Sequence, residues 1–283
     1  MPELPEVETI RRILQDGTAQ VPSLIGQTIS DVSLFWLRTL ATPAPEVFTS
    51  FLKGKSIVGL ERRGKYLILD LDEGYLIFHL RMSGDLRIDQ NIGISRLSTP
   101  LQPHDRAYLH FKSGYGLAFN DTRKFGRIWL TPDSQSVLNG LGIEPLDPEL
   151  SSDRFFNRLH ATKRLLKPLL LDQHFLAGLG NIYTDEALFL AGLNPKRVSN
   201  TLTTSEAESL LVSIRKVLKL GIINNGASID WIYRGGNFQK YFHVYQQTGN
   251  PCPTCGTPIE RITVGQRGTH FCPLCQPLFK GED

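Results

Sequence analysis

The cysteines constrain the fold of this chain more than any other feature. All four lie between positions 252 and 275, as the pairs Cys252/Cys255 and Cys272/Cys275, with two residues inside each pair and 16 between the pairs. Tetrahedral zinc needs four ligands, and two such pairs supply four thiolates to one ion. Two disulfides or a redox-active pair are the other interpretation of this spacing. We predict one structural Zn²⁺ with no open coordination position.

The segment between the two cysteine pairs predicts a β-hairpin. Residues 259–264 and 269–271 alternate as strands do, and the turn is predicted at Gly265-Gln266-Arg267-Gly268. A two-stranded ribbon has the size to enter a DNA groove, so Arg267 at the hairpin tip is a candidate phosphate ligand. A solvated turn arginine without a ligand is the alternative. We predict that residues 246–283 form a separate zinc finger with four cysteine ligands.

Two larger regions precede the cysteines. Residues 4–17 carry apolar side chains at helical spacing, and from Thr28 to about Leu130 the pattern changes to short β-type runs punctuated by Gly, Asp and Ser. Many short strands with turn signals are typical of a sandwich or a barrel. The clearest runs are 55–60, 66–71, 75–80, 107–111 and 117–119, and residues 89–106 predict a polar loop.

Helical periodicity dominates after a hinge with two prolines at 141–150. The predicted helices are 153–160, 168–173, 181–191 and 204–220, followed by a long glycine-rich loop within 226–245. The chain is therefore expected to be an α+β multidomain protein. An N-terminal β-domain, either a sandwich or a barrel, would span 1–145, a helical module 146–245, and the zinc finger the remainder.

Charge and hydropathy limit the classes of function. Lys and Arg number 31 against 28 Asp and Glu, a net charge of +3, so a nucleic-acid partner would require positive charge gathered on one face. No run of about 18 apolar residues predicts a membrane span. The N-terminus lacks the basic and apolar regions of a secretory signal. We expect a cytoplasmic monomer with no membrane association.

The extreme N-terminus is a candidate nucleophile. Removal of Met1 would leave Pro2 with a secondary α-amine, and an α-amine pKa of about 7.7–8.0 leaves a useful fraction unprotonated at neutral pH. Such an amine can attack a sugar carbon and form an iminium. Glu3, beside it, could protonate the sugar ring oxygen. Pro-Glu is also ordinary at a helix start, so the spacing alone leaves the catalytic role a hypothesis.

Five segments then occur in a diagnostic order: PELPEVET at 2–9, HLRMSG at 79–84, DTRKFGR at 121–127, LAGLGNIYTDEALFLAG at 176–192, and the terminal cysteine unit. Together they resemble the formamidopyrimidine-DNA glycosylase family, bacterial enzymes for 8-oxoguanine and ring-opened purines. The resemblance covers nearly the whole chain. It implies an N-terminal antiparallel β-sandwich with flanking helices, a helix-two-turns-helix DNA-binding module and a zinc finger. It also implies excision of oxidised purines from damaged double-stranded DNA, with strand cleavage by β,δ-elimination.

The resemblance also implies a catalytic set. Pro2 matches the Schiff-base nucleophile and Glu3 the catalytic acid, with Glu6 at the pocket. Lys65, in RRGKYL, and Arg267 would complete the set through contacts to phosphates around the lesion. Without the resemblance, Lys65 would be interpreted as a solvated lysine at a strand end.

A predicted wedge is the first part of the DNA-binding set. Met82, Arg123 and Phe125 match the residues that the family inserts into DNA, although Met82 and Phe125 taken singly would be core residues. An inserted apolar wedge offsets the unstacking that base extrusion requires. Arg123 is expected to hydrogen-bond the cytosine left without a partner.

Three further residues complete the predicted DNA-binding set. Asn181 follows Gly178-Leu179-Gly180, where a helix start presents N–H groups that suit a phosphate; a plain N-cap is the alternative. Lys167 matches a family lysine associated with oxidised-purine processing, and would otherwise be a helix-start lysine. His104 is the third member.

One departure and two rival functions remain. The family segment usually contains glycine where this chain has Arg81, which could alter the wedge loop. The endonuclease VIII branch, which removes oxidised pyrimidines, is the nearest rival, but Leu4 and the predicted wedge favour the purine branch. The other rival is a non-catalytic zinc-ribbon protein that binds damaged DNA. Retention of the predicted catalytic set argues against it.

Overall fold

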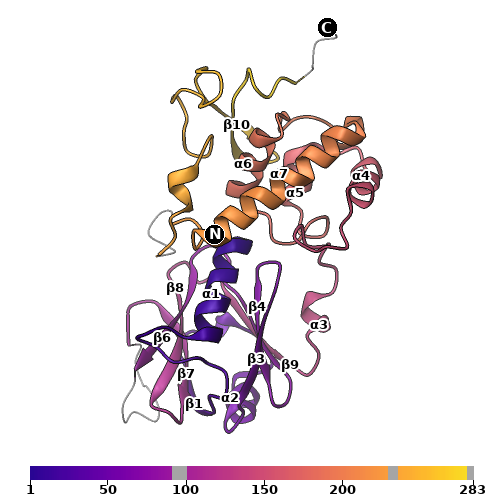
Figure 1. Cartoon of the computed structure of the whole chain (residues 1–283). Helices are drawn as coiled ribbons and strands as arrows, with labels where there is room; N and C mark the ends of the chain where they lie inside the picture. Colours follow the sequence, from indigo (N-terminus) through magenta and orange to yellow (C-terminus); the bar gives the residue numbers. More distant parts are fainter. Residues whose placement is uncertain (91–100, 229–234, 279–283) are drawn as a thin grey trace. The chain divides into compact units, whose positions relative to one another are not determined.

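The structure is a computed structural model, and it describes residues 1–90, 101–228 and 235–278 (Figure 1). The chain divides into two compact units. The first comprises Met1–Asn139 together with Ser228 and Gly235, and the second comprises Gly140–Ala227 and the described residues from Gly236 on. The division falls at the start of the hinge predicted at 141–150. The two units are described separately.

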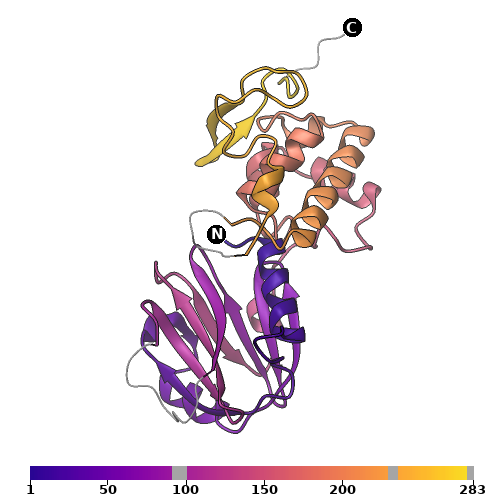
Figure 2. The same cartoon turned by 60° about the vertical axis from the view of Figure 1, so that its left-hand side comes forward.

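The first unit contains two β-sheets that share one apolar core (Figure 2). Core side chains come from both sheets, including Val32, Leu109 and Phe119 from one and Leu69 and Phe78 from the other. The predicted N-terminal β-fold is therefore confirmed. The four-stranded sheet has the order β1 (Ile29–Leu34), β7 (Asp105–Phe111), β8 (Tyr115–Asp121), β6 (Gly84–Gln90), and the five-stranded sheet has the order β2 (Leu40–Thr42), β9 (Arg127–Thr131), β5 (Tyr75–His79), β4 (Tyr66–Leu71), β3 (Ile57–Arg63).

The strand pairs are antiparallel except for β2 and β9, which are parallel. The consecutive antiparallel pairs β3–β4, β4–β5 and β7–β8 are joined by short turns, and the β3–β4 and β4–β5 turns lie at opposite ends of their sheet. The loop predicted at 89–106 is shorter at both ends, because β6 continues to Gln90 and β7 begins at Asp105. Residues 91–100 of that prediction lie outside the described residues.

Helices flank the sheets of the first unit. Helix α1 (Leu4–Asp16) packs against β3 and β4, and α2 (Pro45–Leu52) packs against β1. The β-type pattern predicted for this region did not include α2. Its signals are a proline in the first turn and the buried pair Phe48 and Leu52, four residues apart. The short helices η1 (Leu37–Thr39) and α3 (Gln135–Leu138) complete the described helices of this unit.

The second unit is helical, as predicted. Helix α6 is buried along Ile182–Phe189 and packs against α7, which also packs against α4. The short helix η3 lies inside the region predicted as a loop, of which residues 229–234 lie outside the described residues. The helices are α4 (Ser152–His160), α5 (Leu166–Leu171), α6 (Asn181–Leu190), η2 (Ser199–Thr201), α7 (Thr204–Ile223) and η3 (Phe238–Tyr241).

The cysteine unit packs against the helices of the second unit, and its bounds as a separate finger stay a prediction. Its buried residues Cys252, Ile259 and Cys272 share a small apolar cluster with Phe189 of α6 and with Val244. A finger of this size has almost no core of its own, so packing against α6 supplies apolar burial that the hairpin lacks.

The hairpin of the finger consists of β10 (Glu260–Val264) and β11 (Arg267–Phe271). Its turn contains two residues, not the four predicted, because Val264 already pairs with Arg267. Gly265 and Gln266 have φ of 56° and 62°, the left-handed conformation of a type I′ turn, which matches the twist of the strands. Arg267 is therefore the first residue of β11.

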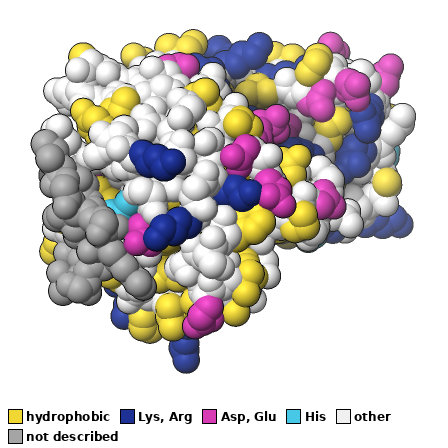
Figure 3. Space-filling view, turned by 90° about the horizontal axis from the view of Figure 1, so that it is seen from below, with side chains coloured by type: hydrophobic (Ala, Val, Ile, Leu, Met, Phe, Trp, Pro, Cys, Tyr) yellow, Lys and Arg dark blue, Asp and Glu magenta, His cyan; other side chains and the backbone are white. Residues whose placement is uncertain are grey.

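None of the helices within the described residues combines the length and the apolar character that crossing a membrane requires. Figure 3 shows one face of the molecule, where Lys and Arg side chains are interspersed with Asp and Glu. That face does not gather positive charge of the kind expected for a nucleic-acid interface.

Candidate active site and nucleic-acid interface

Helix α1 begins directly after the candidate nucleophile. Glu3 is its N-cap, and the backbone N–H of Glu3 donates to Oε2 of Glu6 at 2.7 Å. The Glu3 side chain accepts from the backbone of Glu6 in return, which completes a capping box. Glu3 and Glu6 are 3% and 2% exposed. The chain end that carries Pro2 is thus held by reciprocal hydrogen bonds, and Glu6 has a structural part in that hold.

A second set of contacts fixes α1 to the sheet. The Glu8 carboxylate accepts from Arg62 Nε of β3 at 3.0 Å, from Arg12 Nε at 2.8 Å and from Arg11 Nη2 at 3.0 Å. Burial alone would raise the pKa of Glu8, but the hydrogen bonds from Arg11 and Arg12 and the charge of Arg62 outweigh burial and lower it to about 2. This carboxylate stays ionised and anchors the helix that carries Pro2.

The strand register brings the predicted residues of the first unit to one end of the sandwich. Arg63, Tyr66, His79 and Arg127 stand in a row across β3, β4, β5 and β9. Beyond this row the chain forms the β3–β4, β5–β6 and β8–β9 turns. These turns carry Lys65, Met82, and Arg123 with Phe125, and the bond between Glu8 and Arg62 brings the start of α1 to the same end.

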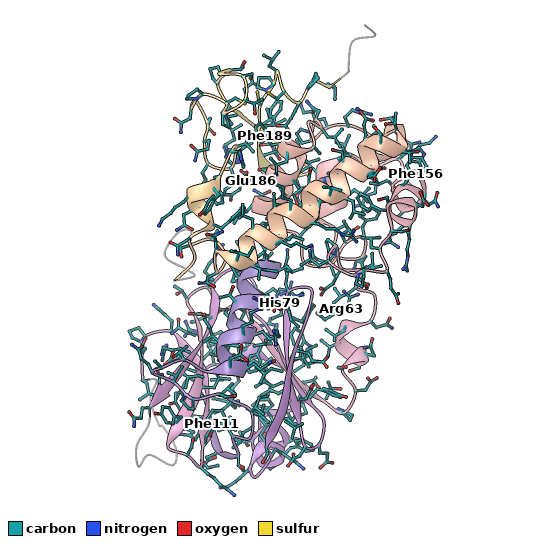
Figure 4. The ribbon with its side chains drawn as sticks, in the orientation of Figure 1. Arg63, His79, Phe111, Phe156, Glu186 and Phe189 are labelled. Carbon is teal, nitrogen blue, oxygen red and sulfur yellow. The ribbon has the colours of Figure 1, made fainter. Side chains whose placement is uncertain are left out.

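His79, labelled in Figure 4, is a site residue that sequence reasoning missed. It is 6% exposed, and its ring packs edge-on against Tyr66 with centroids 4.5 Å apart. Burial, with the nearby charges of Arg81 and Lys65, lowers the pKa of His79 to about 3. The ring is therefore neutral, and Nδ1 accepts from the Arg81 N–H at 3.0 Å. In the sequence, His79 could have been found only as the first residue of the HLRMSG segment.

The wedge residues lie on two turns next to each other. Phe125 is 52% exposed, so it is not a core residue, and the Arg123 guanidinium lies 5.6 Å from the centre of its ring. Arg123 is exposed and Met82 is half-buried. Their insertion into DNA stays a prediction. Arg81 has φ 54°, the left-handed conformation in which glycine is unstrained. The loop therefore has a backbone conformation that suits the family's glycine, although arginine occupies this position.

The other two predicted residues of this unit differ in exposure. His104 is exposed, has φ 75°, and precedes β7 at the same end of the sandwich, where its carbonyl accepts from the Asp121 N–H at 2.9 Å. Lys65 is 4% exposed. A DNA phosphate would therefore contact the exposed His104 directly, whereas the Lys65 side chain is buried. Both roles stay predictions.

The four cysteines fit one zinc ion. Their Sγ atoms all lie within 4.8 Å of one another, and the distances are 3.8 Å for Cys252–Cys275 and 3.5 Å for Cys255–Cys272. Tetrahedral zinc with Zn–S of about 2.3 Å requires edges of about 3.8 Å. Backbone N–H groups of Thr254 and Cys275 donate to sulfurs at 3.4 Å. Four thiolates complete the ion's coordination, so it would be structural and not catalytic.

Asn181 and the hairpin are hydrogen-bonded to each other. Asn181 Nδ2 donates to the Gly268 carbonyl, next to Arg267, at 2.9 Å. Gly180 is the N-cap of α6 and Asn181 the first helical residue, so the N-cap interpretation of Asn181 is wrong. Arg267 is exposed. The bond holds these two candidate phosphate ligands at a fixed separation, and their contacts with DNA stay predictions.

Lys167 is buried inside the second unit, and its part in the processing of oxidised purines stays a prediction. Its side chain is 0% exposed, and Nζ is paired with Asp185 of α6 and donates to the Asn181 carbonyl at 3.1 Å. A buried ammonium is tolerated only when it is paired. Asp185 Oδ2 in turn accepts from the His270 N–H at 3.0 Å. Lys167 thus connects α5, α6 and the hairpin.

Glu186, labelled with Phe189 in Figure 4, is another residue that the sequence did not reveal. Its fully buried carboxylate accepts from the N–H groups of His243, Val244 and Tyr245 at 2.9–3.1 Å, and contacts His243 Nδ1 at 2.8 Å. It fixes the chain where it approaches the finger. Its only signal was its place in NIYTDEALF.

Family comparisons match all three parts of the chain. The formamidopyrimidine-DNA glycosylase N-terminal domain matches residues 1–128, the formamidopyrimidine-DNA glycosylase H2TH domain matches 141–232, and a zinc finger found in FPG and IleRS matches 249–278. Such a β-domain, helical module and zinc finger in this order define a zinc-containing DNA-repair glycosylase. The predicted structural zinc and fold class are confirmed.

Whole-chain relatives agree. The formamidopyrimidine-DNA glycosylases of Protochlamydia amoebophila (strain UWE25) and Geobacillus kaustophilus (strain HTA426) are each 41% identical over 285 residues, covering 98% of this chain and 99% and 100% of the relatives. The chain belongs to the formamidopyrimidine-DNA glycosylase family.

Solved structures are also similar. MutM in complex with DNA containing carbocyclic 8-oxo-G has a TM-score of 0.87 and 38% identity, covering 98% of this chain and 100% of that one. Lactococcus lactis FPG in complex with FAPY-dG DNA has a TM-score of 0.86 and 38% identity, covering 97% and 100%.

Proposed function

We propose that this glycosylase excises 8-oxoguanine and ring-opened purines from duplex DNA through a Schiff base at Pro2, and then cleaves the strand as an abasic-site lyase. One observation carries the mechanism: the capping box that holds Glu3 and Glu6 fixes the chain end next to Pro2. The DNA in the similar complexes, 8-oxo-G and FAPY-dG, supports the substrate class.

The proposed chemistry begins at the Pro2 nitrogen. While Met1 is attached this nitrogen belongs to an amide, whose lone pair is delocalised, so Met1 must be removed first. The free amine attacks C1′ of the sugar as the bond from C1′ to the base breaks, and the proton that the nitrogen loses passes to the departing base. Glu3, in its protonated form, then donates its proton to the ring oxygen as the sugar opens, which leaves the iminium. The iminium makes the C2′ proton acidic. Its loss expels the 3′ phosphate by β-elimination, and δ-elimination expels the 5′ phosphate.

DNA recognition is proposed to use both units. Met82 and Phe125 would occupy the space left by the extruded nucleotide, and Arg123 would bond the orphan cytosine. Asn181 and Arg267 would hold phosphates, with Lys65 and His104 as further phosphate contacts. We propose that the chain works as a cytoplasmic monomer, since its curated relatives are bacterial repair enzymes.

Borohydride trapping tests this function. The chain with a free Pro2 should form a covalent adduct with an 8-oxoguanine duplex, and a matched chain with a Gly-Ser extension before Met1 should form none. Pro2→Gly should lose the adduct and keep DNA binding. An adduct of equal yield from the extended chain refutes Pro2, and absence of any adduct favours the non-catalytic DNA-binding protein.

The competing pyrimidine activity has one observation in its favour, because wild-type Lactococcus lactis FPG is similar to this chain and was solved with DNA containing an oxidised pyrimidine. A parallel reaction on a thymine glycol duplex separates the two. Faster excision of 8-oxoguanine supports the purine assignment, and faster excision of thymine glycol overturns it.

A further inference from the structure

The two turns that carry the proposed wedge are joined by a buried polar contact. Asp121, at the end of β8, is 0% exposed, and Ser83, next to Met82, is 6% exposed. The Ser83 hydroxyl donates to Oδ1 of Asp121 and accepts from the backbone N–H of Arg123 at 3.0 Å. A single hydroxyl of the Met82 turn therefore touches both the carboxylate and the backbone of the other turn.

The same carboxylate closes the second turn on itself. Oδ1 of Asp121 also accepts from the Arg123 N–H at 3.2 Å, and Oδ2 accepts from the Gly126 N–H at 2.7 Å. The exposed residues Arg123 and Phe125 thus belong to a loop in which the N–H groups of Arg123 and Gly126 both donate to the buried Asp121 carboxylate. Hydrogen bonds to a charged acceptor are stronger than neutral ones, and burial removes the competing water.

The space around this contact leaves little freedom for either turn. A Cβ on Gly126 would lie 2.4 Å from the Phe119 ring and 3.1 Å from Asp121 Oδ2, and a Cβ on Gly84 would lie 2.4 Å from the Leu80 carbonyl oxygen. The Lys124 ammonium, in the exposed part of the same loop, lies 4.2 Å from the centre of the Trp36 ring. Close packing at Gly84 and Gly126 therefore restricts the backbone of both turns. The side chains proposed to enter DNA extend from this restricted backbone.

We infer that Ser83 and Asp121 are positioning residues that join the Met82 turn and the Arg123–Phe125 turn into one rigid element, so that the wedge enters DNA as a unit. This inference rests on the proposed function of the three wedge residues. Its specific consequence is energetic coupling: if the turns are joined, removal of Met82 disturbs the placement of Arg123, and the reverse. If the two turns are independent, the fold-losses of excision rate from Met82→Ala and Arg123→Ala multiply in the double variant.

The test is a double-mutant cycle on single-turnover excision of 8-oxoguanine opposite cytosine. Met82→Ala, Arg123→Ala and their combination are measured in the parent chain, in Ser83→Ala and in Ser83→Thr, which keeps the hydroxyl. Ser113→Ala is the matched control, because Ser113 also makes a side-chain hydrogen bond, to Gln27 at 2.6 Å, on the β7–β8 turn at the other end of the sheet.

We expect the combined loss in the parent, Ser83→Thr and Ser113→Ala chains to be smaller than the product of the single losses. In Ser83→Ala it should equal the product. Ser83→Ala should also reduce the preference for cytosine over adenine opposite the lesion by about fivefold, the worth of one hydrogen bond. Cleavage of a ready-made abasic site, which needs no wedge to expel a base, should be unchanged. A purely structural role would lower both activities together.

Three results would overturn the inference, and they are distinguishable. If Met82→Ala and Arg123→Ala each lower the excision rate and their effects multiply in the parent chain, the connection between the two turns is refuted and the wedge role is retained. Absence of any loss in both single variants refutes the wedge role and the joint with it. A Ser83→Ala chain that retains the parental coupling also refutes the joint.

Discussion

The Glu8 carboxylate allows a quantitative test of how helix α1 is held against β3. We consider Glu8→Gln, which keeps the shape and the hydrogen-bond acceptor but removes the charge. The folded-state pKa of about 2 against an ordinary 4.5 corresponds to about 3 kcal/mol at about 1.36 kcal/mol for each pH unit. Arg12 is 53% exposed and so partly screened by water, and we therefore expect a loss of about 1.5 kcal/mol.

The pH dependence fixes the origin of that loss. The folded-state pKa of Glu8 is below its unfolded value, so the stabilisation is complete above about pH 4.5 and disappears as the pH falls toward 2. The parent chain and Glu8→Gln should therefore differ at neutral pH and converge in acid. His79 adds an acid loss common to both chains, because its pKa is lowered from 6.5 to about 3 and the unfolded chain takes up the proton first.

The assay is urea unfolding followed by circular dichroism at several pH values. Glu73→Gln is the control, because Glu73 pairs with Lys55 at 2.5 Å but is 67% exposed, and screened surface pairs contribute little. The reasoning fails if Glu8→Gln equals the control at neutral pH. It also fails if the curves of the parent chain and Glu8→Gln remain parallel into the acid range.

The remaining predictions concern single contacts. Phe125→Ala should leave the melting temperature unchanged because the ring is 52% exposed; a loss of about 3–5 kcal/mol, typical of a core phenylalanine, would refute the wedge role. Arg81→Gly should raise the unfolding free energy by up to about 1 kcal/mol, since φ 54° costs an L-residue about that much, and thermal melts check this. Lys167→Met should cost about 3–5 kcal/mol by leaving Asp185 buried without its cation, whereas Lys167→Met/Asp185→Asn should recover part of it in the same melts. Chelation of zinc, or Cys255→Ser, should lower the melting transition of the second unit and spare the first, as calorimetry with zinc analysis would show.

Periodicity was sufficient for the regular elements of the fold and insufficient where a short element or a turn depends on tertiary packing. Strand β4 was predicted at its observed bounds, and the helices of the second unit within a few residues. Helix α2 was missed because its few apolar residues resemble a strand run, and its helical state depends on packing against β1. The hairpin turn was predicted too long because Arg267 has no local signal that separates a turn from a strand end.

The zinc ligands were predictable because a motif carries them, and the role of Pro2 stays a prediction from its own motif. Positions such as Pro2 and the cysteines stand in specific sequence patterns, whereas the partners of buried charges do not. Asp185 lies 18 residues from Lys167 in the chain, and Ser83 lies 38 residues from Asp121. Spacing within one element does not reveal such pairs, because only the folded topology brings them together. For the same reason the sequence does not reveal that the Lys167 ammonium pairs with Asp185.

The position of the zinc finger does not depend on the peptide that leads into it. Before the link near Gln246, Glu186 binds the backbone of residues 243–245. After it, Asn181 binds Gly268. Asn194 Nδ2 also donates to the Gln276 carbonyl at 2.7 Å, and Gln276 Nε2 donates to the Leu193 carbonyl at 2.9 Å. The exposed link near Gln246, which has φ 58°, lies between these two sets of anchors. Cutting the chain there would leave both sets of contacts in place, so we expect the two fragments to stay associated without the peptide link.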